Sequence, residues 1–495
     1  MVVSGTELMQ LDELVAGFPI GGLPDRPIEV TGIGHDSREI APGDLFVAIV
    51  GERFDGRVFS REAVAKGAAA VLSVGAPPAD FDGVWLTASS PRSLLAPLAA
   101  RLFGHPDREL LMVGVTGTNG KSTVVAIVQS ILEAAGRPTG RLGTLGYSFG
   151  DLELAAERTT PEGSELFKTL RSMRERGAEA VAMEVSSHAL EQARLEAVTF
   201  DVGVFLNLSR DHFDYHDDFE SYFAAKRRLF AQLKDGGRAV VNIDDPYGRR
   251  LAEELPPALT FGRNADVEAR DSAVDENGIR GTLSTARGSF DFESQLLGGY
   301  NLDNIVAAAA VAVALDVDVE PIVRGIAATG ILPGRMERVN PGGSVPVFID
   351  YAHTDAALAA ALESLRRLTG RRVLLVFGCG GDRDPGKRVL MGRVAGELAD
   401  LPIVTSDNPR QEDPLAIIEA VRQGLEQSGN EAYRVIPDRR QAIRQAIAAV
   451  EPGWAVLIAG KGHEEVQIVG DQRLPFSDRH EVESALEERF GTAGG

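Results

Sequence analysis

A glycine-rich loop between a strand and a helix constrains the fold of this chain more than any other feature. Residues 114–122, GVTGTNGKS, follow a short apolar run and open a helical stretch. Glycines let backbone N–H groups converge on an anion, and the start of the helix adds its dipole. In such a loop Lys121 reaches the β- and γ-phosphates of a nucleotide and Ser122 offers a hydroxyl to Mg²⁺. The usual pattern GxxxxGK[ST] has glycine where this chain has Val115, so an ordinary glycine turn is the alternative.

The pattern around this loop predicts an α/β protein. Beyond residue 110, strand-like and helical stretches alternate, which is typical of βαβ units and a mostly parallel sheet. Residues 263–295 interrupt the alternation and predict an antiparallel ribbon. At 495 residues the chain is long enough for about three domains. We predict a small N-terminal α/β domain (1–107), a central parallel-sheet domain with the phosphate loop (108–333) and a C-terminal Rossmann-like α/β domain (334–495).

Charge and cysteine content exclude several classes of protein. There are 51 Lys and Arg against 72 Asp and Glu, a net charge of −21, which argues against a nucleic-acid or anionic-membrane binder. The single cysteine, Cys379, cannot form an intrachain disulfide and indicates a reducing compartment. The longest apolar run, 305–315, is too short to span a membrane. We therefore expect a cytoplasmic protein without membrane insertion.

Several polar residues lie where a phosphate-handling site would need them. Glu184 ends an apolar strand and could hold Mg²⁺, and His212 could hold a second ion, although magnesium prefers oxygen ligands. Either residue alone has a structural alternative, as a helix cap or a hydrogen-bonded histidine. Lys226 is followed by Arg227 and Arg228, and on residue type alone such a basic run is a solvated helix face.

Nine further segments together resemble the Mur ligase family. Beside TGTNGKST (116–123), the chain contains EVSSHAL (184–190), NLSRDHFDYH (207–216), YFAAKRRLF (222–230), GGYNLDNIVAA (298–308), LPGRMERV (332–339), DYAHT (350–354), CGGDRDPGKR (379–388), SDNPR (406–410) and the uridine-side DSRE (36–39). No single segment is decisive, but their shared order is specific. CGGDRDPGKR and SDNPR are similar to the branch that adds the third amino acid to the peptidoglycan precursor.

The resemblance implies an ADP-forming amide ligase that uses ATP as co-substrate and Mg²⁺ as cofactor. In the family a substrate carboxylate attacks the γ-phosphate, and an amine then displaces phosphate from the acyl phosphate. The implied catalytic residues are Lys121, Lys226, Glu184 and His212. The implied ATP-binding residues are Gly117, Thr118, Asn119, Gly120, Lys121, Ser122, Thr123, Asn301, Arg335 and Asp350. The implied metal site comprises Ser122, Glu184, His212 and Lys226, the lysine being carbamylated so that it carries an anionic oxygen-bearing group.

The other implied partners are UDP-N-acetylmuramoyl-L-alanyl-D-glutamate and meso-diaminopimelate, and we expect a monomer. The residues implied for the muramoyl-dipeptide are Ser37, Thr159, Thr160, Ser186, Gln192 and Arg194. Those implied for diaminopimelate are Arg383, Asp407, Asn408, Pro409, Arg410, Gly460 and Glu464. Arg410 could grip the distal carboxylate that distinguishes diaminopimelate from lysine, because a guanidinium donates two parallel hydrogen bonds.

Three alternatives remain at this point. A lysine-adding relative would keep nearly every segment except DNPR, and a folylpolyglutamate synthase would lack both DSRE and SDNPR. A phosphate-loop switch without enzymatic activity would leave Glu184, His212 and Lys226 with no shared task. The chain also departs from the family pattern at Asp355, where proline is usual, at Ser122 in place of threonine, and in the turn at 217–218.

Overall fold

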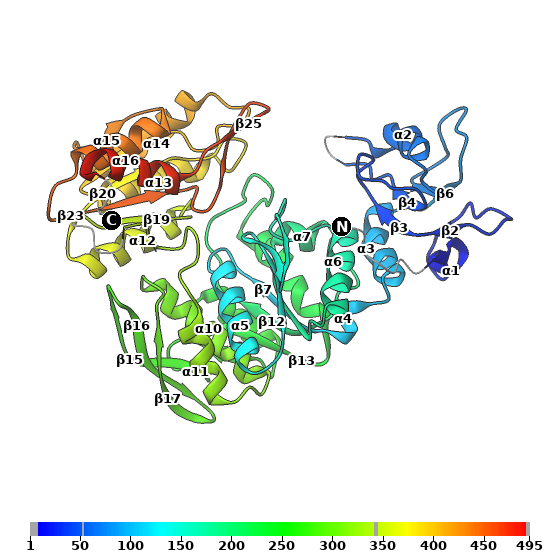
Figure 1. Cartoon of the computed structure of the whole chain (residues 1–495), viewed down its shortest axis with the longest axis horizontal. Helices are drawn as coiled ribbons and strands as arrows, with labels where there is room; N and C mark the ends of the chain where they lie inside the picture. Colours follow the sequence, from blue (N-terminus) through cyan, green and yellow to red (C-terminus); the bar gives the residue numbers. More distant parts are fainter. Residues whose placement is uncertain (1–7, 52–53, 341–344, 492–495) are drawn as a thin grey trace. The chain divides into compact units, whose positions relative to one another are not determined.

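The computed structural model describes residues 8–51, 54–340 and 345–491 (Figure 1). They form two compact units, each described here by itself. The first contains the described residues up to 116 together with 136–204 and 224–239, and the second contains 117–135, 205–223 and the described residues from 240 onward. This division follows contacts rather than chain order, so the three predicted domain ranges remain predictions.

The N-terminal part of the first unit contains a four-stranded sheet in which every neighbouring pair is parallel. Its small core is formed by Ile40, Phe46, Val71 and their neighbours. The strands are β3 (Gly32–Gly34), β4 (Asp44–Val47), β5 (Ala70–Ser73) and β6 (Trp85–Thr87), beside the pair β1 (Met9–Gln10) and β2 (Glu29–Val30). The helices are α1 (Leu11–Val15), η1 (Gly56–Phe59), α2 (Ser60–Ala65), α3 (Pro91–Leu102) and α4 (Pro106–Glu109).

The central sheet has eight strands in the order β10-β9-β8-β11-β7-β12-β13-β14. Its middle strands β7 and β11 are almost wholly buried and apolar, as expected for parallel strands covered on both faces. The strands are β7 (Leu111–Thr116), β8 (Thr139–Gly143), β9 (Gly146–Phe149), β10 (Leu152–Leu154), β11 (Ala180–Glu184), β12 (Phe200–Phe205), β13 (Leu233–Asn242) and β14 (Leu259–Phe261). The mostly parallel sheet predicted for this region is confirmed, with antiparallel pairs at β8-β9 and β9-β10.

The predicted antiparallel ribbon at 263–295 is also confirmed. It is a three-stranded sheet of β15 (Glu268–Asp275), β16 (Gly278–Thr285) and β17 (Gly288–Ser294). The helices of this middle part of the chain are α5 (Lys121–Ala134), α6 (Gly163–Glu175), α7 (Ser187–Glu191), α8 (Phe219–Arg227), η2 (Arg228–Gln232), α9 (Pro246–Glu254), α10 (Tyr300–Ala314) and α11 (Val319–Ala328).

The C-terminal sheet has six strands in the order β18-β19-β23-β20-β21-β22 and is parallel except for β18. They are β18 (Glu337–Arg338), β19 (Val347–Asp350), β20 (Arg372–Phe377), β21 (Leu401–Val404), β22 (Arg434–Val435) and β23 (Trp454–Ala459). The remaining elements are α12 (Asp355–Thr369), α13 (Gly386–Leu398), α14 (Pro414–Ser428), α15 (Arg439–Ala449), α16 (Asp478–Phe490) and the antiparallel hairpin β24 (Val466–Val469) and β25 (Gln472–Pro475).

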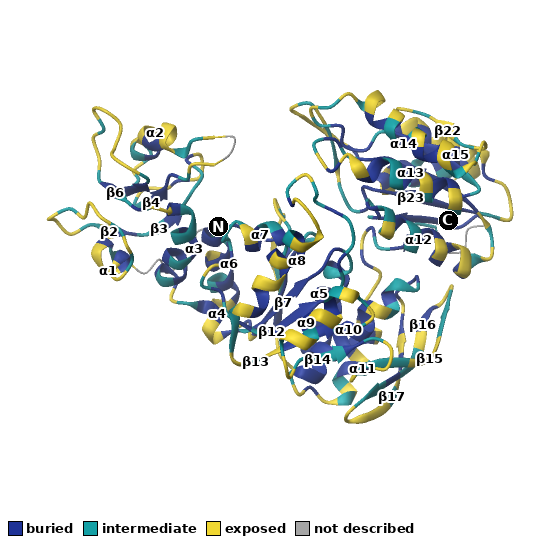
Figure 2. Ribbon diagram, turned by 180° about the vertical axis from the view of Figure 1, so that it is seen from behind, coloured by how far each residue is buried: buried dark blue, intermediate teal, exposed yellow. Residues whose placement is uncertain are grey.

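Alternate residues of β20 separate two cores in this part. Leu375 and Phe377 pack with α12, α13 and α14, whereas Leu374 and Val376 pack with α15 and α16. The sheet is therefore covered on both faces, and its inner strands, such as β23, are dark blue in Figure 2 while the helices over it expose their outer sides. This confirms the predicted Rossmann-like arrangement. Within the described ranges no helix is long and apolar enough to cross a membrane.

The topology brings three loops together at one edge of this sheet. Strands β23, β20 and β21 are parallel neighbours, so the loops that leave their carboxyl ends start side by side. These loops are residues 460–464, 378–385 and 405–413. The crevice at the carboxyl ends of parallel strands is where α/β sheets bind ligands.

Candidate functional site

The phosphate loop follows β7 and ends where α5 begins at Lys121. Gly120 has φ +90°, and a Cβ there would lie 2.3 Å from Oδ1 of Asn304, so only glycine fits this close approach. Ser122 and Thr123 are buried in the first turn of the helix. The strand–loop–helix arrangement predicted from the sequence is confirmed, and phosphate binding by the loop remains a prediction.

One amide side chain braces this loop. Oδ1 of Asn207, just after β12, accepts from the backbone N–H groups of Thr118 (3.1 Å) and Asn119 (2.9 Å), and its Nδ2 donates to the carbonyl of Asn119 at 3.1 Å. The Thr118 hydroxyl accepts from the N–H of Ser209 at 3.0 Å. The loop is thus tied to the segment 207–209, the beginning of the NLSRDH motif.

Two cationic side chains of the second unit, those of Lys121 and Arg335, make hydrogen bonds at the phosphate loop and the first turn of α5. Nζ of Lys121 donates to the carbonyls of Gly117 and Thr118, both at 2.9 Å. Nη2 of Arg335 donates to the hydroxyl of Ser122 at 3.1 Å, and its guanidinium lies over the ring of Tyr351 at 4.7 Å. Arg335 therefore lies at the phosphate loop, as its predicted role requires.

Asn301 and Asp350 are more deeply engaged in the protein than their predicted roles suggested. Nδ2 of Asn301 donates to the carbonyl of Leu297 at 2.7 Å, and its Oδ1 accepts from Asn304 at 2.9 Å. Oδ2 of the buried Asp350 accepts from the hydroxyl of Tyr300 and the N–H of Met336, both at 2.7 Å, and Oδ1 accepts from the N–H of Ala352 at 2.9 Å. Burial raises the pKa of Asp350 above its usual range. The nucleotide roles of the two residues remain predictions.

His212 lies beside a buried carboxylate that the sequence did not single out. His212 has a positive φ of 60°, and its Nε2 is 3.4 Å from Asp211, which is 4% exposed. Nε2 of His353 and Nζ of Lys387 approach the same carboxylate at 3.6 and 3.4 Å. Burial alone would raise the pKa of Asp211, but the neighbouring side chains of His212, His353 and Lys387 hold it well below its usual range. The RDH motif is thereby linked to the C-terminal sheet's loops, as is Arg210, which pairs with Asp384 at 2.9 Å.

In the first unit, the residues predicted for the muramoyl-dipeptide surround the end of β11. The hydroxyl of Thr160 donates to the carbonyl of Glu184 (2.9 Å) and accepts from the N–H of Ser186 (3.0 Å). Ser186 also caps α7. The carboxylate of Glu184 accepts from the N–H of Thr144 at 2.8 Å, and the hydroxyls of Thr144 and Thr159 are 3.1 Å apart. The structure therefore brings Thr159, Thr160, Ser186 and Glu184 together.

Beside them, three arginines converge on Glu162, which is 4% exposed. Arg92 of α3 lies 2.9 Å from its carboxylate, Arg194 lies 3.0 Å away and Arg158 lies 3.9 Å away. Burial alone would raise the pKa of Glu162, but Arg194 and Arg92 outweigh it and hold the pKa below its usual range. Nη2 of Arg194 also donates to the side-chain oxygen of Gln192 at 2.6 Å. One carboxylate for three guanidinium groups leaves this cluster positively charged.

Ser37 lies elsewhere in the N-terminal part. Its hydroxyl donates to Glu62 at 3.2 Å, and its carbonyl accepts from Lys66 at 2.8 Å. Its role toward uridine remains a prediction. His35, in contrast, is affected by the arginine cluster: burial lowers its pKa most, and the charges of Glu162, Arg92 and Arg158 also act on this pKa.

Lys226 corrects one interpretation made from residue type. It is 1% exposed, whereas the neighbouring Arg227 and Arg228 are exposed. The solvated-face interpretation is therefore wrong for Lys226 and right for the two arginines, because α8 turns Lys226 toward the interior. Arg228 pairs with Glu191 at 3.1 Å.

The residues predicted for diaminopimelate lie at the three loops that leave β20, β21 and β23. Nδ2 of Asn408 donates to Glu464 at 2.8 Å, and the fully buried Lys461 donates to both Asn408 and Glu464 at 2.9 Å. A Cβ on Gly460 would lie 2.5 Å from the carboxylate of Asp407, so this approach requires glycine. We call residues 406–410 the acceptor loop.

Arg410 is the last residue of the acceptor loop. Its Nη1 donates to the carbonyl of Gly381 at 2.7 Å, and its backbone pairs with Ile468 and Gly470 of the hairpin. Burial and the neighbouring Arg383 lower the pKa of Arg410 below its usual value, because a half-buried cation beside a second cation is disfavoured. An anion beside Arg410 would relieve this repulsion.

The predicted magnesium ligands divide between the units. Ser122 and His212 belong to the second unit, and Glu184 and Lys226 belong to the first. In the part of the chain that the structure describes, no three His, Cys, Asp or Glu side chains gather as a metal site. The donor types nevertheless fit Mg²⁺: a hydroxyl, a carboxylate and, if Lys226 is carbamylated, a second carboxylate-like group.

Three family models match consecutive parts of the chain. The "Mur ligase family, catalytic domain" matches residues 29–101, the "Mur ligase middle domain" matches 115–312 and the "Mur ligase, glutamate ligase domain" matches 334–462. Together with the fold and the clusters described above, these matches show that the chain belongs to the Mur ligase family.

The similarity extends to individual relatives over nearly their whole length. The UDP-N-acetylmuramoyl-L-alanyl-D-glutamate–2,6-diaminopimelate ligase of Geobacter metallireducens is 43% identical, with 93% of this chain and 95% of the relative covered. The ligase of the same name from Gloeobacter violaceus is 43% identical, with 97% and 99% covered. A solved structure of a ligase of this name is 33% identical, with a TM-score of 0.67 and with 97% and 99% covered.

Several residues of these clusters were missed from the sequence. Asn207 and Asp211 lie within a segment that was recognised, and their positions beside the phosphate loop and His212 offered a signal. Glu162 follows Thr160 by two residues, which was a weaker signal. Lys387 also lies within a recognised segment, CGGDRDPGKR, but its partner Asp211 is 176 positions away in the chain, and Arg92 gave no signal because its partner Glu162 is 70 positions away.

Proposed function

We propose that this protein is an ADP-forming ligase that joins meso-2,6-diaminopimelate to UDP-N-acetylmuramoyl-L-alanyl-D-glutamate, using ATP and Mg²⁺, in cytoplasmic peptidoglycan precursor synthesis. The observation that carries the proposal is the mixed charge of the acceptor loop and its neighbours. Arg410 and Arg383 offer guanidinium groups, while Asp407 and Glu464 offer carboxylates. The distal end of diaminopimelate carries one carboxylate and one ammonium, and it complements both signs.

The relatives support the same substrates. Those described above carry this activity in their names, and this chain matches them over more than nine-tenths of its length. Lysine lacks the distal carboxylate, so with lysine bound Arg410 would face no anion. The lysine-adding alternative therefore fits these residues less well.

The phosphate half of the reaction needs positioning and charge neutralisation. A glutamate carboxylate of the muramoyl substrate attacks the γ-phosphorus, a new O–P bond forms, and the bond to the β-phosphate oxygen breaks to release ADP. Lys121 neutralises the β- and γ-phosphates, and Arg335, already at Ser122, adds a second positive charge. The loop's backbone N–H groups and the start of α5 complete the anion site.

The amide half needs an amine close to the acyl phosphate. The amine nitrogen attacks the acyl carbon, the C–N bond forms, and the C–O bond to phosphate breaks with loss of a proton. The acceptor loop holds the far end of diaminopimelate and so orients its other amine. Arg194 and Arg92 hold the carboxylate-rich dipeptide.

Magnesium would supply additional charge neutralisation at the transferring phosphoryl group. Ser122, Glu184, His212 and carbamylated Lys226 are the residues we assign to holding it or to bracing its ligands.

A coupled assay tests the proposal. Phosphate release should require ATP, the UDP-muramoyl-dipeptide and diaminopimelate together, and mass spectrometry should find the tripeptide product. With L-lysine in place of diaminopimelate, turnover should fall sharply. Equal use of both amino acids would contradict the substrate assignment, and phosphate release independent of either substrate would favour a nucleotide switch.

Lys226 provides a separate test. Lys226→Ala should lose most activity, and added short carboxylates should partly restore it by replacing the carbamate. The control is Arg227→Ala, which removes an exposed cation of the same helix and should leave activity nearly unchanged. An unmodified lysine in the electron density of a nucleotide-bound crystal would contradict the carbamate.

A further inference from the structure

Lys461 is a charged residue with no assigned part in the function proposed above. It follows Gly460 in the loop after β23, and its side chain has no exposed surface. Its Nζ donates to Oδ1 of Asn408 and to Oε2 of Glu464, both at 2.9 Å. Both partners are assigned to diaminopimelate. Because the ammonium of Lys461 is fully buried, it can act on a ligand only through these two side chains.

The burial of Lys461 is not explained by stability. Replacing a buried ion pair by apolar side chains is often neutral or stabilising, since taking charges out of water is costly. The Glu464 side chain is 27% exposed, so a ligand can reach one member of the pair and not the other. A lysine at this position therefore points to a role in the site itself.

The hydrogen bonds of Asn408 leave its side-chain oxygen no capacity for a ligand. Oδ1 accepts from Lys461 and, at 3.0 Å, from the N–H of Ile468 in β24. These two donors use both lone pairs of an amide oxygen. Nδ2 donates to Oε2 of Glu464 at 2.8 Å. Asn408 therefore links Glu464 to the hairpin instead of accepting from an ammonium of the ligand.

The same donors leave one oxygen of Glu464 for the ligand. Lys461 and Asn408 both donate to Oε2, whereas Oε1 has no hydrogen-bond donor among the described residues. Two converging donors fix the orientation of the carboxylate. Oε1 is then the oxygen that can accept from the distal ammonium of diaminopimelate.

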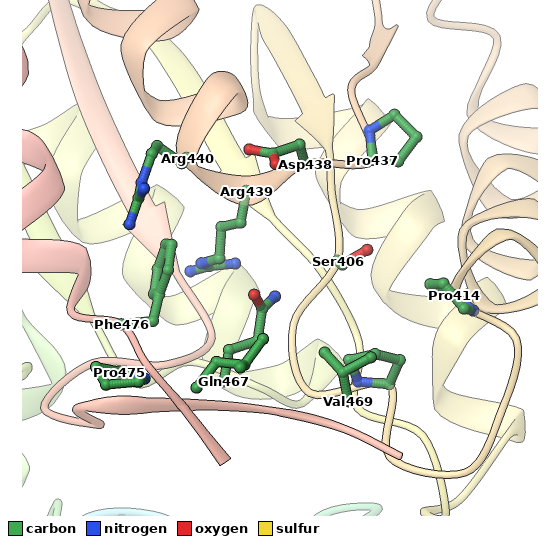
Figure 3. A pocket seen from close by; sticks show the side chains of 12 residues that line it. Ser406, Pro414, Pro437, Asp438, Arg439, Arg440, Gln467, Val469, Pro475 and Phe476 are labelled. Atoms are coloured by element: carbon green, nitrogen blue, oxygen red, sulfur yellow. The ribbon is translucent and has the colours of Figure 1, made fainter. Parts of the chain in front are cut away.

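The backbone of the acceptor loop is held separately by the hairpin. Nε2 of Gln467 donates to the carbonyl of Asp407 at 2.8 Å. Gln467 lines a pocket of about 330 Å³ that the hairpin and the start of α15 border (Figure 3). Lys461, Asn408 and Glu464 do not line this pocket. Lys461 thus acts on the side chains of the site, and Gln467 acts on its backbone.

Lys461 also sets the charge of the site. With it, the site contains three cations, Arg383, Arg410 and Lys461, and two carboxylates, Asp407 and Glu464. The distal end of diaminopimelate carries an ammonium and a carboxylate, whereas the distal end of lysine carries an ammonium alone. The additional positive charge therefore disfavours lysine more than diaminopimelate.

We propose that Lys461 is a positioning residue that determines the choice of amino acid. It holds Glu464 and Asn408 in the geometry that receives the distal ammonium, and its charge opposes a distal end that carries an ammonium alone. This inference rests on the proposed function, since it takes diaminopimelate as the substrate.

Lys461→Met tests the proposal, because methionine is similar in length and lacks the charge and both hydrogen bonds. We expect kcat/KM for diaminopimelate to fall about 10- to 100-fold, mainly through KM, with the KM for ATP unchanged. L-Lysine should lose much less. In a mixture of both amino acids, mass spectrometry of the two tripeptide products should show a preference for diaminopimelate that is at least about tenfold smaller than in the wild type.

Lys234→Met is the matched control. Nζ of Lys234, in β13 of the first unit, donates to Asp201 at 2.8 Å and to the carbonyl of Leu110 at 2.9 Å. This variant also removes a lysine bound to one carboxylate and one further oxygen, but it should leave the product ratio unchanged.

A crystal structure of the unaltered protein with diaminopimelate gives a test that does not depend on the folding of a variant. The distal ammonium should lie within about 3.2 Å of Oε1 of Glu464, with Lys461 still bound to Oε2. An ammonium bound to Oδ1 of Asn408, or Lys461 displaced from Oε2, would overturn the proposal.

The kinetic outcomes separate this inference from the proposed function. In a protein that prefers diaminopimelate, an equal loss for both amino acids in Lys461→Met would show that Lys461 only supports the fold, and would overturn this inference alone. A wild-type protein that uses lysine as readily as diaminopimelate would overturn the proposed function and this inference with it.

Discussion

The two clusters that we assign to substrates are built from similar side chains but differ in charge balance. In the first unit, three arginines share the single carboxylate of Glu162. In the second unit, Arg410, Arg383 and Lys461 are interspersed with the carboxylates of Asp407 and Glu464. The first cluster suits a substrate fragment that carries only negative charge, and the second suits an end that carries both signs. The charge composition of each cluster is therefore the basis on which we assign its substrate.

The largest expected effect is a loss of turnover at the phosphate loop, which should impair the use of both substrates. Lys121→Ala removes the charge that neutralises the β- and γ-phosphates, so turnover should fall about a thousandfold or more whatever amino acid is supplied. Steady-state kinetics at saturating ATP measure this, and thermal unfolding serves as the control for folding. Near-normal turnover would contradict the phosphate-loop assignment.

Arg410→Ala should affect only the use of diaminopimelate. It changes the cluster of Arg410, Arg383, Lys461, Asp407 and Glu464, which we call the mixed-charge cluster. Losing a charge-assisted pair with the distal carboxylate costs about 2–5 kcal/mol, or roughly 30- to several-thousand-fold in use of diaminopimelate. The KM for ATP should change little. Arg473→Ala is the control, because Arg473 is an exposed arginine of the adjacent hairpin. Equal losses for ATP and diaminopimelate would show that Arg410 supports the fold rather than the substrate.

Glu162→Gln should affect only the arginine cluster. The neutral side chain can no longer balance Arg92 and Arg194, so we expect kcat/KM for the UDP-muramoyl-dipeptide to fall about 10- to 100-fold, mainly through KM. Glu157→Gln is the matched control, since Glu157 lies 3.8 Å from Arg158 and is 74% exposed. A loss confined to diaminopimelate kinetics would reverse our assignment of the two clusters.

The smallest expected effect is a pH dependence of the arginine cluster. Burial lowers the pKa of His35, so the unfolded chain binds a proton at this position more readily than the folded one. The free energy of unfolding should therefore fall as the pH drops below about 6.5, the ordinary pKa of an exposed histidine. Urea unfolding at several pH values should show less of this loss in His35→Gln. An unchanged slope would mean that His35 does not contribute.

Sequence reasoning succeeded where the determining contacts are local. The phosphate loop and the antiparallel ribbon could be predicted, because short-range periodicity and glycine spacing define them. The loops after β20 and β21 were singled out by the resemblance of their residues to the Mur ligases. The burial of Lys226 could not be predicted from its basic neighbours, since it depends on which face α8 turns inward. The pairing of Arg92 with Glu162 joins residues 70 positions apart, and only the packing of α3 brings them together.

Asn207 has a consequence for the cost of nucleotide binding. Ordering the backbone of a loop costs about 1–2 kcal/mol of conformational entropy per residue. By holding Thr118 and Asn119 with three hydrogen bonds, Asn207 lets the chain pay this cost when it folds. ATP then meets a preorganised cradle, and its binding free energy remains available for aligning the γ-phosphate with the attacking carboxylate.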